Sequence, residues 1–345
     1  FNALCFIPIG HLISNFMSKV NTLISYSFNL LGSLLGIILF IIFSFLNTSP
    51  IIWIIFSFIL FILIIKDYLK QFSFSILSIL FLTIILSLNV KDNKETIYSP
   101  YQNISVQHLS SPINPIIIQN GHLFYQTILN LSDDLLFTRE KEILDIRIMG
   151  PWVNKTHEKE FYNLPYSISK KKPKSVLIIG SGAGNDVAAA NRFNINNIKA
   201  VEIDPVIAKL GHKYHPEEPY QNENVELIID DARNYISKTE EKFDAIVYAL
   251  LDSQTNLSAK GGIRLDSYVY TVEAFKEARE KLNKNGYIFL SFFVQEKKLG
   301  YKIFSMLEAA FGKKPLVIKS EANDRYIFVV SENFENFQFN HLKFF

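Results

Sequence analysis

Closely spaced glycines are the first residues in this chain that indicate chemistry. Gly180, Gly182 and Gly184 stand at alternate positions in SVLIIGSGAGNDVAAA, where a short apolar run meets a small-residue helical pattern. A strand that turns sharply into a helix through glycines brings backbone N–H groups close to a ligand. Asn185 occupies the position where a dinucleotide fingerprint needs Gly or Ala, and no Gly-Lys-Ser/Thr follows, which excludes a P-loop.

Acidic residues follow the next two apolar runs. Glu202 ends the run in AVEIDP, and Asp231 with Ala232 follows the run in IIDDARNY. A carboxylate at Glu202 can accept hydrogen bonds from both ribose hydroxyls. One at Asp231 can accept from an adenine amino group, and the small Ala232 leaves room for the ring. A glycine loop and two acidic strand ends thus indicate a site for a nucleoside without a phosphate. The ligand that this predicts is S-adenosylmethionine or a close relative such as its decarboxylated form.

Alternating strand and helix patterns position these residues. An α/β fold follows from this alternation, with a Rossmann-like, doubly wound and mostly parallel sheet whose ligands bind outside the carboxyl ends of the strands. Upstream, TIYSPYQNISVQHL and IIIQNGHLFYQ predict a small β-hairpin domain with Asn120-Gly121 at its turn. The expected strands are 175–180, 198–203, 225–230, 243–250, 286–293, 315–319 and 325–330, and the expected helices are 185–193, 205–213, 232–237, 272–283 and 298–311.

The first 92 residues have a different composition. No charged residue occurs from Val20 to Ile65 or from Gln71 to Val90. Because ~20 apolar residues can cross a bilayer as a helix, we expect transmembrane helices near 23–47, 51–69 and 72–90. Buried core helices are the alternative. The expected domains are 1–92, as the C-terminal part of a larger membrane domain, 95–165, as a small β domain and connector, and 166–345, as the cofactor-binding domain.

The net charge and the few possible metal-binding residues argue against two further kinds of function, nucleic-acid binding and metal binding. The net charge of +2 gives no reason to expect nucleic acid as a partner. Cys5 is the only cysteine, so the sequence offers neither a disulfide framework nor a thiolate metal site. His212 and His215 stand three apart, but prolines follow them, which is typical of a loop after a helix. We therefore expect no metal.

A long ordered run resembles the spermidine synthase-like proteins of bacterial membranes. It comprises VLIIGSGAGNDVAAA, AVEIDPVIAKLGHKYHPEEPY, DDARNYI, FDAIVYALLDSQT and RLDSYVYTVEAFKEAR, and SPYQNI with its hairpin resembles the small β domain of spermidine synthases. The resemblance implies the fold of S-adenosylmethionine-dependent transferases. It also implies an enzyme that transfers an aminopropyl group from decarboxylated S-adenosylmethionine to a diamine such as putrescine.

The resemblance also implies site residues and a location. Asp252 and Tyr101 are the expected catalytic residues, and Gln102 and Asp186 the expected substrate-binding residues. An Asx turn is the alternative for Asp252, and packing within a strand is the alternative for Tyr101 and Gln102. The expected partners are a small-molecule amine and the lipid bilayer, with a homo-oligomer left open. The expected location is the inner membrane, with several spans and the catalytic domain in the cytoplasm.

Two carboxylates of the family pattern are missing. Ala249 stands where the family has its catalytic acid after the fourth strand, and Ala183 stands where its G-G-G-D-G-G loop has Asp. With no carboxylate at position 183 to repel the methionine carboxylate, S-adenosylmethionine itself stays open as the donor. Two alternatives to aminopropyl transfer follow: a methyltransferase of unknown acceptor, and a catalytically impaired module that senses a nucleoside or polyamine.

Overall fold

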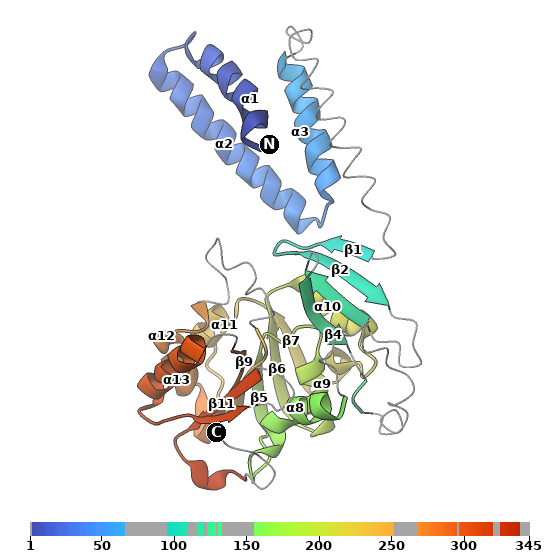
Figure 1. The fold of residues 1–345 in the computed structure, drawn as a ribbon, viewed down its shortest axis with the longest axis vertical. Coiled ribbons are helices and arrows are strands. Elements are labelled where there is room, and N and C mark those ends of the chain that lie inside the picture. Colours follow the sequence, from blue (N-terminus) through green and yellow to red (C-terminus); the bar gives the residue numbers. More distant parts are fainter. Residues whose placement is uncertain are drawn as a thin grey trace. The chain divides into compact units, whose positions relative to one another are not determined.

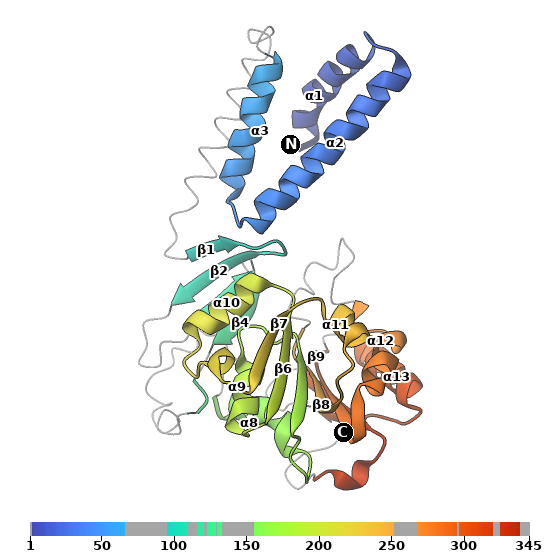
Figure 2. The same ribbon diagram turned by 180° about the vertical axis from the view of Figure 1, so that it is seen from behind.

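The chain folds as two compact units, Phe1–Ile104 and Ser105–Phe345, in the computed structural model. Figure 1 and Figure 2 show the elements of each unit from opposite sides. The structure describes residues 2–65, 95–108, 116–120, 123–128, 130–132, 155–251, 268–294, 297–319 and 325–338. The domain boundaries expected from the sequence stay predictions.

Long apolar helices make up most of the first unit. Asn21 caps the second helix, because its side-chain oxygen accepts a hydrogen bond from the N–H of Leu23 at 3.0 Å. The rings of Phe40 and Trp53 meet edge to face with centroids 5.0 Å apart, so the second and third helices pack together. The elements are α1 (Asn2–Met17), α2 (Thr22–Phe45), α3 (Pro50–Ile65) and strand β1 (Glu95–Tyr98).

Helix α2 is the one helix among the described residues that is long and apolar enough to cross a membrane. Helix α3 has 16 residues, fewer than the ~20 that a span requires. The expected helix near 72–90 lies outside the described residues. A single apolar helix near the start of a chain is typical of a membrane anchor and of a signal sequence alike. The expectation of several spans therefore gains no support.

A four-stranded sheet has the order β1-β2-β3-β4, with β2 (Asn103–His108), β3 (Ile116–Asn120) and β4 (Leu123–Ile128). Strands β3 and β4 pair antiparallel, with Ile116 opposite Ile128, as the predicted hairpin requires. The register shifts between Ile118 and Gln119. Gly121 lies outside the described residues.

The second unit contains a seven-stranded sheet of order β10-β11-β9-β8-β5-β6-β7. Neighbouring strands from β9 to β7 in this order run parallel, and β10 and β11 are antiparallel. The expected α/β fold with a mostly parallel sheet is confirmed. Its elements are α8 (Lys155–Ser167), β5 (Ser175–Ile179), α9 (Asn185–Arg192), β6 (Asn197–Glu202), α10 (Pro205–Tyr214), the 3₁₀ turn η3 (Pro219–Gln221), β7 (Val225–Ile229), α11 (Ala232–Lys238), β8 (Phe243–Tyr248), α12 (Val272–Glu280), β9 (Leu282–Phe293), α13 (Lys297–Phe311), β10 (Leu316–Lys319), β11 (Arg325–Ser331) and the 3₁₀ turn η6 (Phe334–Asn336).

Helices cover both faces of this sheet. Leu177 and Ile179 of β5 pack in a cluster with residues of α11, α12 and α13. Val176 and Ile178 of the same strand pack in the opposite cluster, with residues of α8 and α9. Because side chains alternate along a strand and both faces are buried, β5 is apolar from Val176 to Ile179. Because helices cover both faces of the sheet, a polar site has to lie at the ends of the strands.

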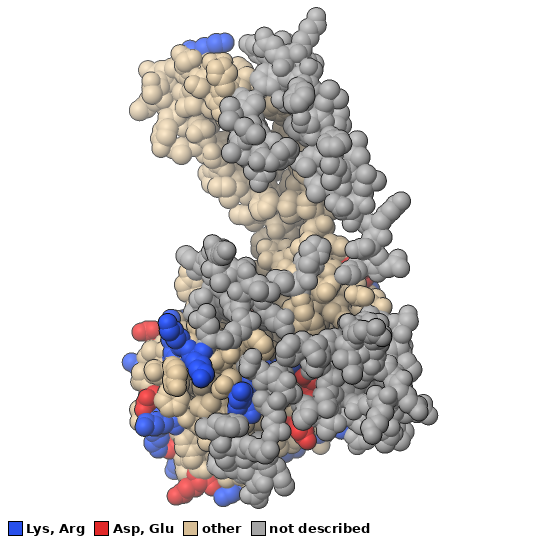
Figure 3. Space-filling model, in the orientation of Figure 1, with Lys and Arg blue, Asp and Glu red and all other residues tan. Residues whose placement is uncertain are grey.

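Charged side chains of both signs are interspersed over the described part of the second unit on the face drawn in Figure 3. Such mixing is typical of a solvated surface, whereas a surface that binds nucleic acid gathers Lys and Arg.

Candidate functional site

The glycine loop joins the carboxyl end of β5 to the start of α9. Gly180, Gly182 and Gly184 all have positive φ angles, of 72°, 57° and 100°. Residues other than glycine adopt this left-handed backbone with strain. A Cβ atom at Gly180 would also lie 1.8 Å from Cδ2 of Leu251, which follows β8. The sequence expectation of a tight strand-to-helix turn is therefore met by a loop that only glycines fit.

Glu202 binds this loop directly. Its Oε2 accepts a hydrogen bond from the N–H of Gly182 at 2.8 Å, and its Oε1 accepts from the N–H of Asp204 at 2.9 Å. The side chain is buried, and burial raises the pKa of Glu202 to about 7, against the lowering effect of the two N–H donors. A carboxylate has about four acceptor positions, and the backbone N–H of Ile203 also lowers the pKa of Glu202, so these donors leave acceptor capacity for a ligand hydroxyl group.

Asp231 lies at the corresponding end of β7. It caps α11, with Oδ1 accepting from the N–H of Asn234 at 3.0 Å. The side chain of Asn234 in turn donates to both carboxylate oxygens of Asp230 at 2.8 Å. Ala232, the first residue of α11, is partly buried beside it. Since β5, β6 and β7 are parallel neighbours, the glycine loop, Glu202 and Asp231 follow one another along one edge of the sheet.

Tyr220, from the turn η3, supports the loop. Its hydroxyl donates to the carbonyl oxygen of Gly182 at 2.7 Å and lies 2.9 Å from Oγ of Ser181, which can donate to it. Burial raises the pKa of Tyr220 well above its ordinary value, so the hydroxyl keeps its proton. A Cβ atom at Gly184 would lie 2.6 Å from Cγ of Pro219, next to Tyr220. The sequence interpretation of this segment as a plain loop missed its supporting role.

The hairpin strand β4 also contacts the loop. Oε1 of Gln126 accepts from the N–H of Ala183 at 2.9 Å, and the side chain of Asn185 donates to the carbonyl oxygen of Thr127 at 2.9 Å. Strand and loop are 57 positions apart at the first of these contacts. No spacing pattern in the sequence joins them, so Gln126 was not foreseen.

Every backbone N–H of residues 180–184 has an acceptor within the protein. The N–H groups of Gly180 and Ser181 both donate to the carbonyl oxygen of Val201, at 2.9 and 3.0 Å. That of Gly184 donates to the carbonyl oxygen of Ser181 at 3.0 Å. The N–H groups of Gly182 and Ala183 donate to the side chains of Glu202 and Gln126. The loop therefore offers a ligand close backbone approach rather than a set of free donors.

His215 belongs to a buried polar chain beneath the loop. The N–H of Glu217 donates to its Nδ1 at 3.2 Å, so Nε2 carries the proton and donates to Oδ1 of Asn185 at 3.1 Å. Burial lowers the pKa of His215 to about 3, which keeps the ring neutral. Within the described residues there is no group of three or more His, Cys, Asp or Glu side chains arranged to hold a metal ion.

Asp186 is buried in the first turn of α9, where burial raises its pKa to about 7. Its charged neighbours are Arg325 on β11 and Arg192 on α9, which lower the pKa, and Glu158 on α8, which raises it. Arg325 is paired with Glu158 at 2.9 Å. The predicted role of Asp186 in substrate binding stays a prediction.

The structure does not test the positions of three other predicted residues. Asp252 lies outside the described residues. Tyr101 and Gln102 belong to the first unit, in the turn between β1 and β2, where both backbone N–H groups donate to Oγ of Ser99, at 3.1 and 2.9 Å. Their catalytic and substrate-binding roles stay predictions.

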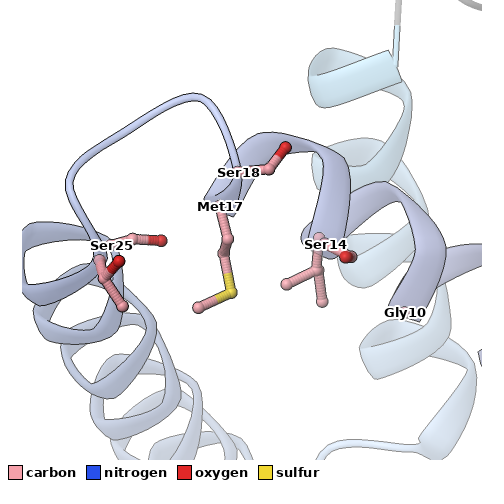
Figure 4. A pocket seen from close by; sticks show the side chains of 7 residues that line it. Gly10, Ser14, Met17, Ser18 and Ser25 are labelled. Carbon is pink, nitrogen blue, oxygen red and sulfur yellow. The ribbon is translucent and has the colours of Figure 1, made fainter.

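A hollow of about 490 Å³ lies between α1 and α2 in the first unit (Figure 4). Ser14, Ser18 and Ser25 line it together with Met17 and Gly10. None of the described lining residues can be ionised, so they offer no group for acid–base chemistry. The glycine-loop edge is the better candidate for a catalytic site.

Comparison with known proteins identifies the domain that carries this edge. Residues 158–311 match the family model of the spermine/spermidine synthase domain. The polyamine aminopropyltransferase of Buchnera aphidicola subsp. Acyrthosiphon pisum is 37% identical over 139 residues, which are 37% of this chain and 45% of that protein. That of Saccharolobus solfataricus is 32% identical over 135 residues, 38% of this chain and 42% of that protein. Residues 158–311 are thus a distant member of the spermine/spermidine synthase domain family.

Solved structures resemble this synthase-type domain in fold. A spermidine synthase in complex with the transition-state analogue AdoDATO is 15% identical, with a TM-score of 0.50, over 73% of this chain and 79% of that one. The spermidine synthase from Thermotoga maritima gives the same identity and TM-score over 73% and 80%. At this identity the likeness supports the fold alone. The chain spans less than half the length of the two relatives named above.

Proposed function

We propose that the synthase-type domain is a transferase that binds a sulfonium nucleoside and transfers its aminopropyl group to an amine. The observation that carries the proposal is the contact between Glu202 and Gly182 at the edge of the sheet. It places a buried carboxylate with spare acceptor capacity beside a glycine loop that a ligand can approach closely. The relatives named polyamine aminopropyltransferase support the reaction type.

The residues at this edge fit a nucleoside without phosphates. Glu202 has acceptor positions for ribose hydroxyls, and Asp231 has a second oxygen for an adenine amino group. Gly180, Gly182 and Gly184 give the ligand room. When bound, decarboxylated S-adenosylmethionine supplies the electrophilic methylene group of the aminopropyl chain.

The acceptor amine must be neutral to attack, so an acidic side chain has to take its proton. We assign this role to Asp252, with Tyr101, Gln102 and Asp186 on the amine side. The change Asp252→Asn should stop turnover and spare donor binding. Normal activity of this variant would demote Asp252 to a turn former.

The test uses the purified full chain with each donor. Binding of S-adenosylmethionine and of its decarboxylated form is measured by calorimetry, and each mixture is then incubated with putrescine. Methylthioadenosine formed from the decarboxylated donor, with spermidine, supports aminopropyl transfer. Failure to bind either donor would refute the proposal.

Methyl transfer from S-adenosylmethionine is the second candidate function. Ala183 favours it, because no carboxylate at that position would repel the carboxylate of the intact donor. S-adenosylhomocysteine is its product in the same assay. Tight binding without any product would instead indicate a module that senses a nucleoside or polyamine.

We propose further that α2 anchors the chain in a membrane, with the synthase-type domain in the cytoplasm where the donor is made. The helix is uncharged from Thr22 to Phe45, and large apolar side chains are exposed along its length. Extraction of membranes with alkaline carbonate should leave the chain in the pellet, and deletion of residues 22–45 should release it. Recovery of the intact chain in the soluble fraction would refute the anchor.

A further inference from the structure

Arg233 lies in the first turn of α11, next to the residues assigned to the adenine. It is the second residue of the helix and follows Asp231 and Ala232 directly. The partial charge at a helix N-terminus is positive, so this turn favours acids over an arginine. The helix itself therefore gives no reason for a cation at this position, and the contacts that Arg233 makes outside α11 have to explain it.

The guanidinium group of Arg233 joins α11 to α12, which lies beside it (Figure 1). Its Nη1 donates to the carbonyl oxygen of Tyr268 at 3.2 Å and to Oγ1 of Thr271 at 3.0 Å, and its Nη2 donates to Oε1 of Glu277 at 3.0 Å. Tyr268 and Thr271 precede α12, and Glu277 belongs to it. The donors of a guanidinium group form a rigid fork, so these contacts fix the first turn of α11 against the start of α12.

Helix α12 is a firm base for this contact. Oγ1 of Thr271 accepts a hydrogen bond from the N–H of Ala274 at 3.1 Å and so caps α12. Phe275 and Ala278 of the same helix are buried in the core cluster on this face of the sheet. Arg233 therefore donates to the capping group of a helix that the core holds in place.

Helix α11 depends more on such support. It has seven residues, of which only Ile236 is buried, and helices shorter than ~12 residues are marginal by themselves. One oxygen of Asp231 accepts from the N–H of Asn234 and caps the helix, and the other is the one assigned to the adenine amino group. The position of that second oxygen therefore follows the position of the first turn.

The ion pair between Arg233 and Glu277 does not account for the arrangement by itself. The two side chains keep 30% and 35% of their surface exposed, so their attraction is weak. Oε2 of Glu277 has no hydrogen-bond partner among the described residues, so the pair uses one carboxylate oxygen only. What Arg233 adds is geometry, through three acceptors that one fork holds at once.

We propose that Arg233 is a positioning residue for the donor, which holds the first turn of α11 so that Asp231 meets the adenine amino group. It thereby sets the preference of the site for adenine over other purines. The inference rests on the proposed nucleoside site and adds a residue to it, and the proposed reaction stays the same. The three groups that Arg233 contacts belong to the protein, so it acts through Asp231.

The test measures the preference for adenine by binding alone. The full chain is titrated by calorimetry with methylthioadenosine, the product of the proposed reaction, and with methylthioinosine, in which a carbonyl oxygen replaces the adenine amino group. The wild type should bind methylthioadenosine about 10- to 100-fold more tightly, the effect of one hydrogen bond to a charged group. Partial unfolding of a variant lowers the binding of both nucleosides alike, so it leaves the ratio of the two affinities unchanged.

Substitutions of two arginines separate positioning from general support. Arg233→Met removes the fork and should lower the ratio by about tenfold. Arg233→Lys keeps the charge opposite Glu277 without the fork, should also lower the ratio, and serves if the Met variant does not fold. Arg279→Met is the matched control, because Arg279 in the last turn of α12 also contacts a carboxylate, that of Glu332, and a carbonyl oxygen, that of Ala310. It should leave the ratio unchanged.

A double-mutant cycle with Asp231→Asn tests whether Arg233 acts through Asp231. Asn caps a helix as well as Asp does, but it carries no charge for the adenine amino group, so this change should itself lower the ratio. Adding Arg233→Met should then lower it no further. A wild-type ratio in both Arg233 variants, or two changes that act independently, overturns the inference and leaves aminopropyl transfer standing. A wild type that binds both nucleosides equally also overturns it. If the wild type binds neither, the proposed function itself fails.

Discussion

The buried carboxyl of Asp186 makes the stability of the fold depend on pH. Burial raises its pKa from 3.8 to about 7, so between these values the folded chain holds a proton that the unfolded chain releases. The free energy of unfolding should therefore fall as the pH rises from about 4 to about 7, and level off above. A shift of about 3 units corresponds to about 4 kcal/mol. Asp186→Asn removes this titrating group. In the variant, the free energy of unfolding should therefore fall by about 4 kcal/mol less than in the wild type between pH 4 and pH 7.

The measurement is urea unfolding of the full chain at pH values from 4.5 to 8.5. Glu202, whose pKa burial also raises to about 7, contributes the pH dependence that remains in the variant. Glu223→Gln, which removes a carboxylate from an exposed position, is the control and should leave the wild-type slope unchanged. If Asp186→Asn and the wild type show the same slope, Asp186 is ionised in the folded chain and its surroundings are more polar than the structure indicates.

Three further substitutions test how the site is held together. Glu202→Ala should abolish calorimetric binding of either donor, and unchanged affinity would remove the ribose assignment. Tyr220→Phe removes the donor to the carbonyl oxygen of Gly182 and should lower the free energy of unfolding by about 1–3 kcal/mol in urea; an unchanged midpoint would mean that the loop does not need this support. Gly184→Ala should cost more than Gly312→Ala in thermal unfolding, because both glycines have positive φ but a Cβ atom at Gly312 meets open space. Equal losses would show that only the backbone angle matters.

The sheet was predictable from the sequence because its signals are local. Four of the five parallel strands, β5 to β8, have five or six residues, most of them apolar, and strands alternate with helices along this part of the chain. This alternation admits few topologies. Strand β5 was expected at 175–180 and is Ser175–Ile179, and α11 was expected at 232–237 and is Ala232–Lys238. The order of strands then places the glycine loop, Glu202 and Asp231 on one edge, as the sequence predicted.

The supports of the site were not predictable in the same way. Tyr220 reaches Gly182 across 38 positions and Gln126 reaches Ala183 across 57, through segments without regular spacing. Asp186 lies two positions after Gly184, which favoured a ligand-binding role, yet it is buried near the ion pair between Glu158 of α8 and Arg325 of β11. Contacts of this kind depend on how loops and helices pack after the sheet has formed.

The hydrogen bonds of the glycine loop also decide what kind of ligand it suits. A loop that binds phosphate presents free N–H groups to the anion, as in a P-loop or a dinucleotide fingerprint. Here Val201, Glu202 and Gln126 accept from four of the five N–H groups of residues 180–184, and the fifth is used within the loop. A phosphate would have to displace a buried carboxylate from Gly182 and then lie beside it, which like charge opposes. A neutral ribose next to a sulfonium cation avoids both costs.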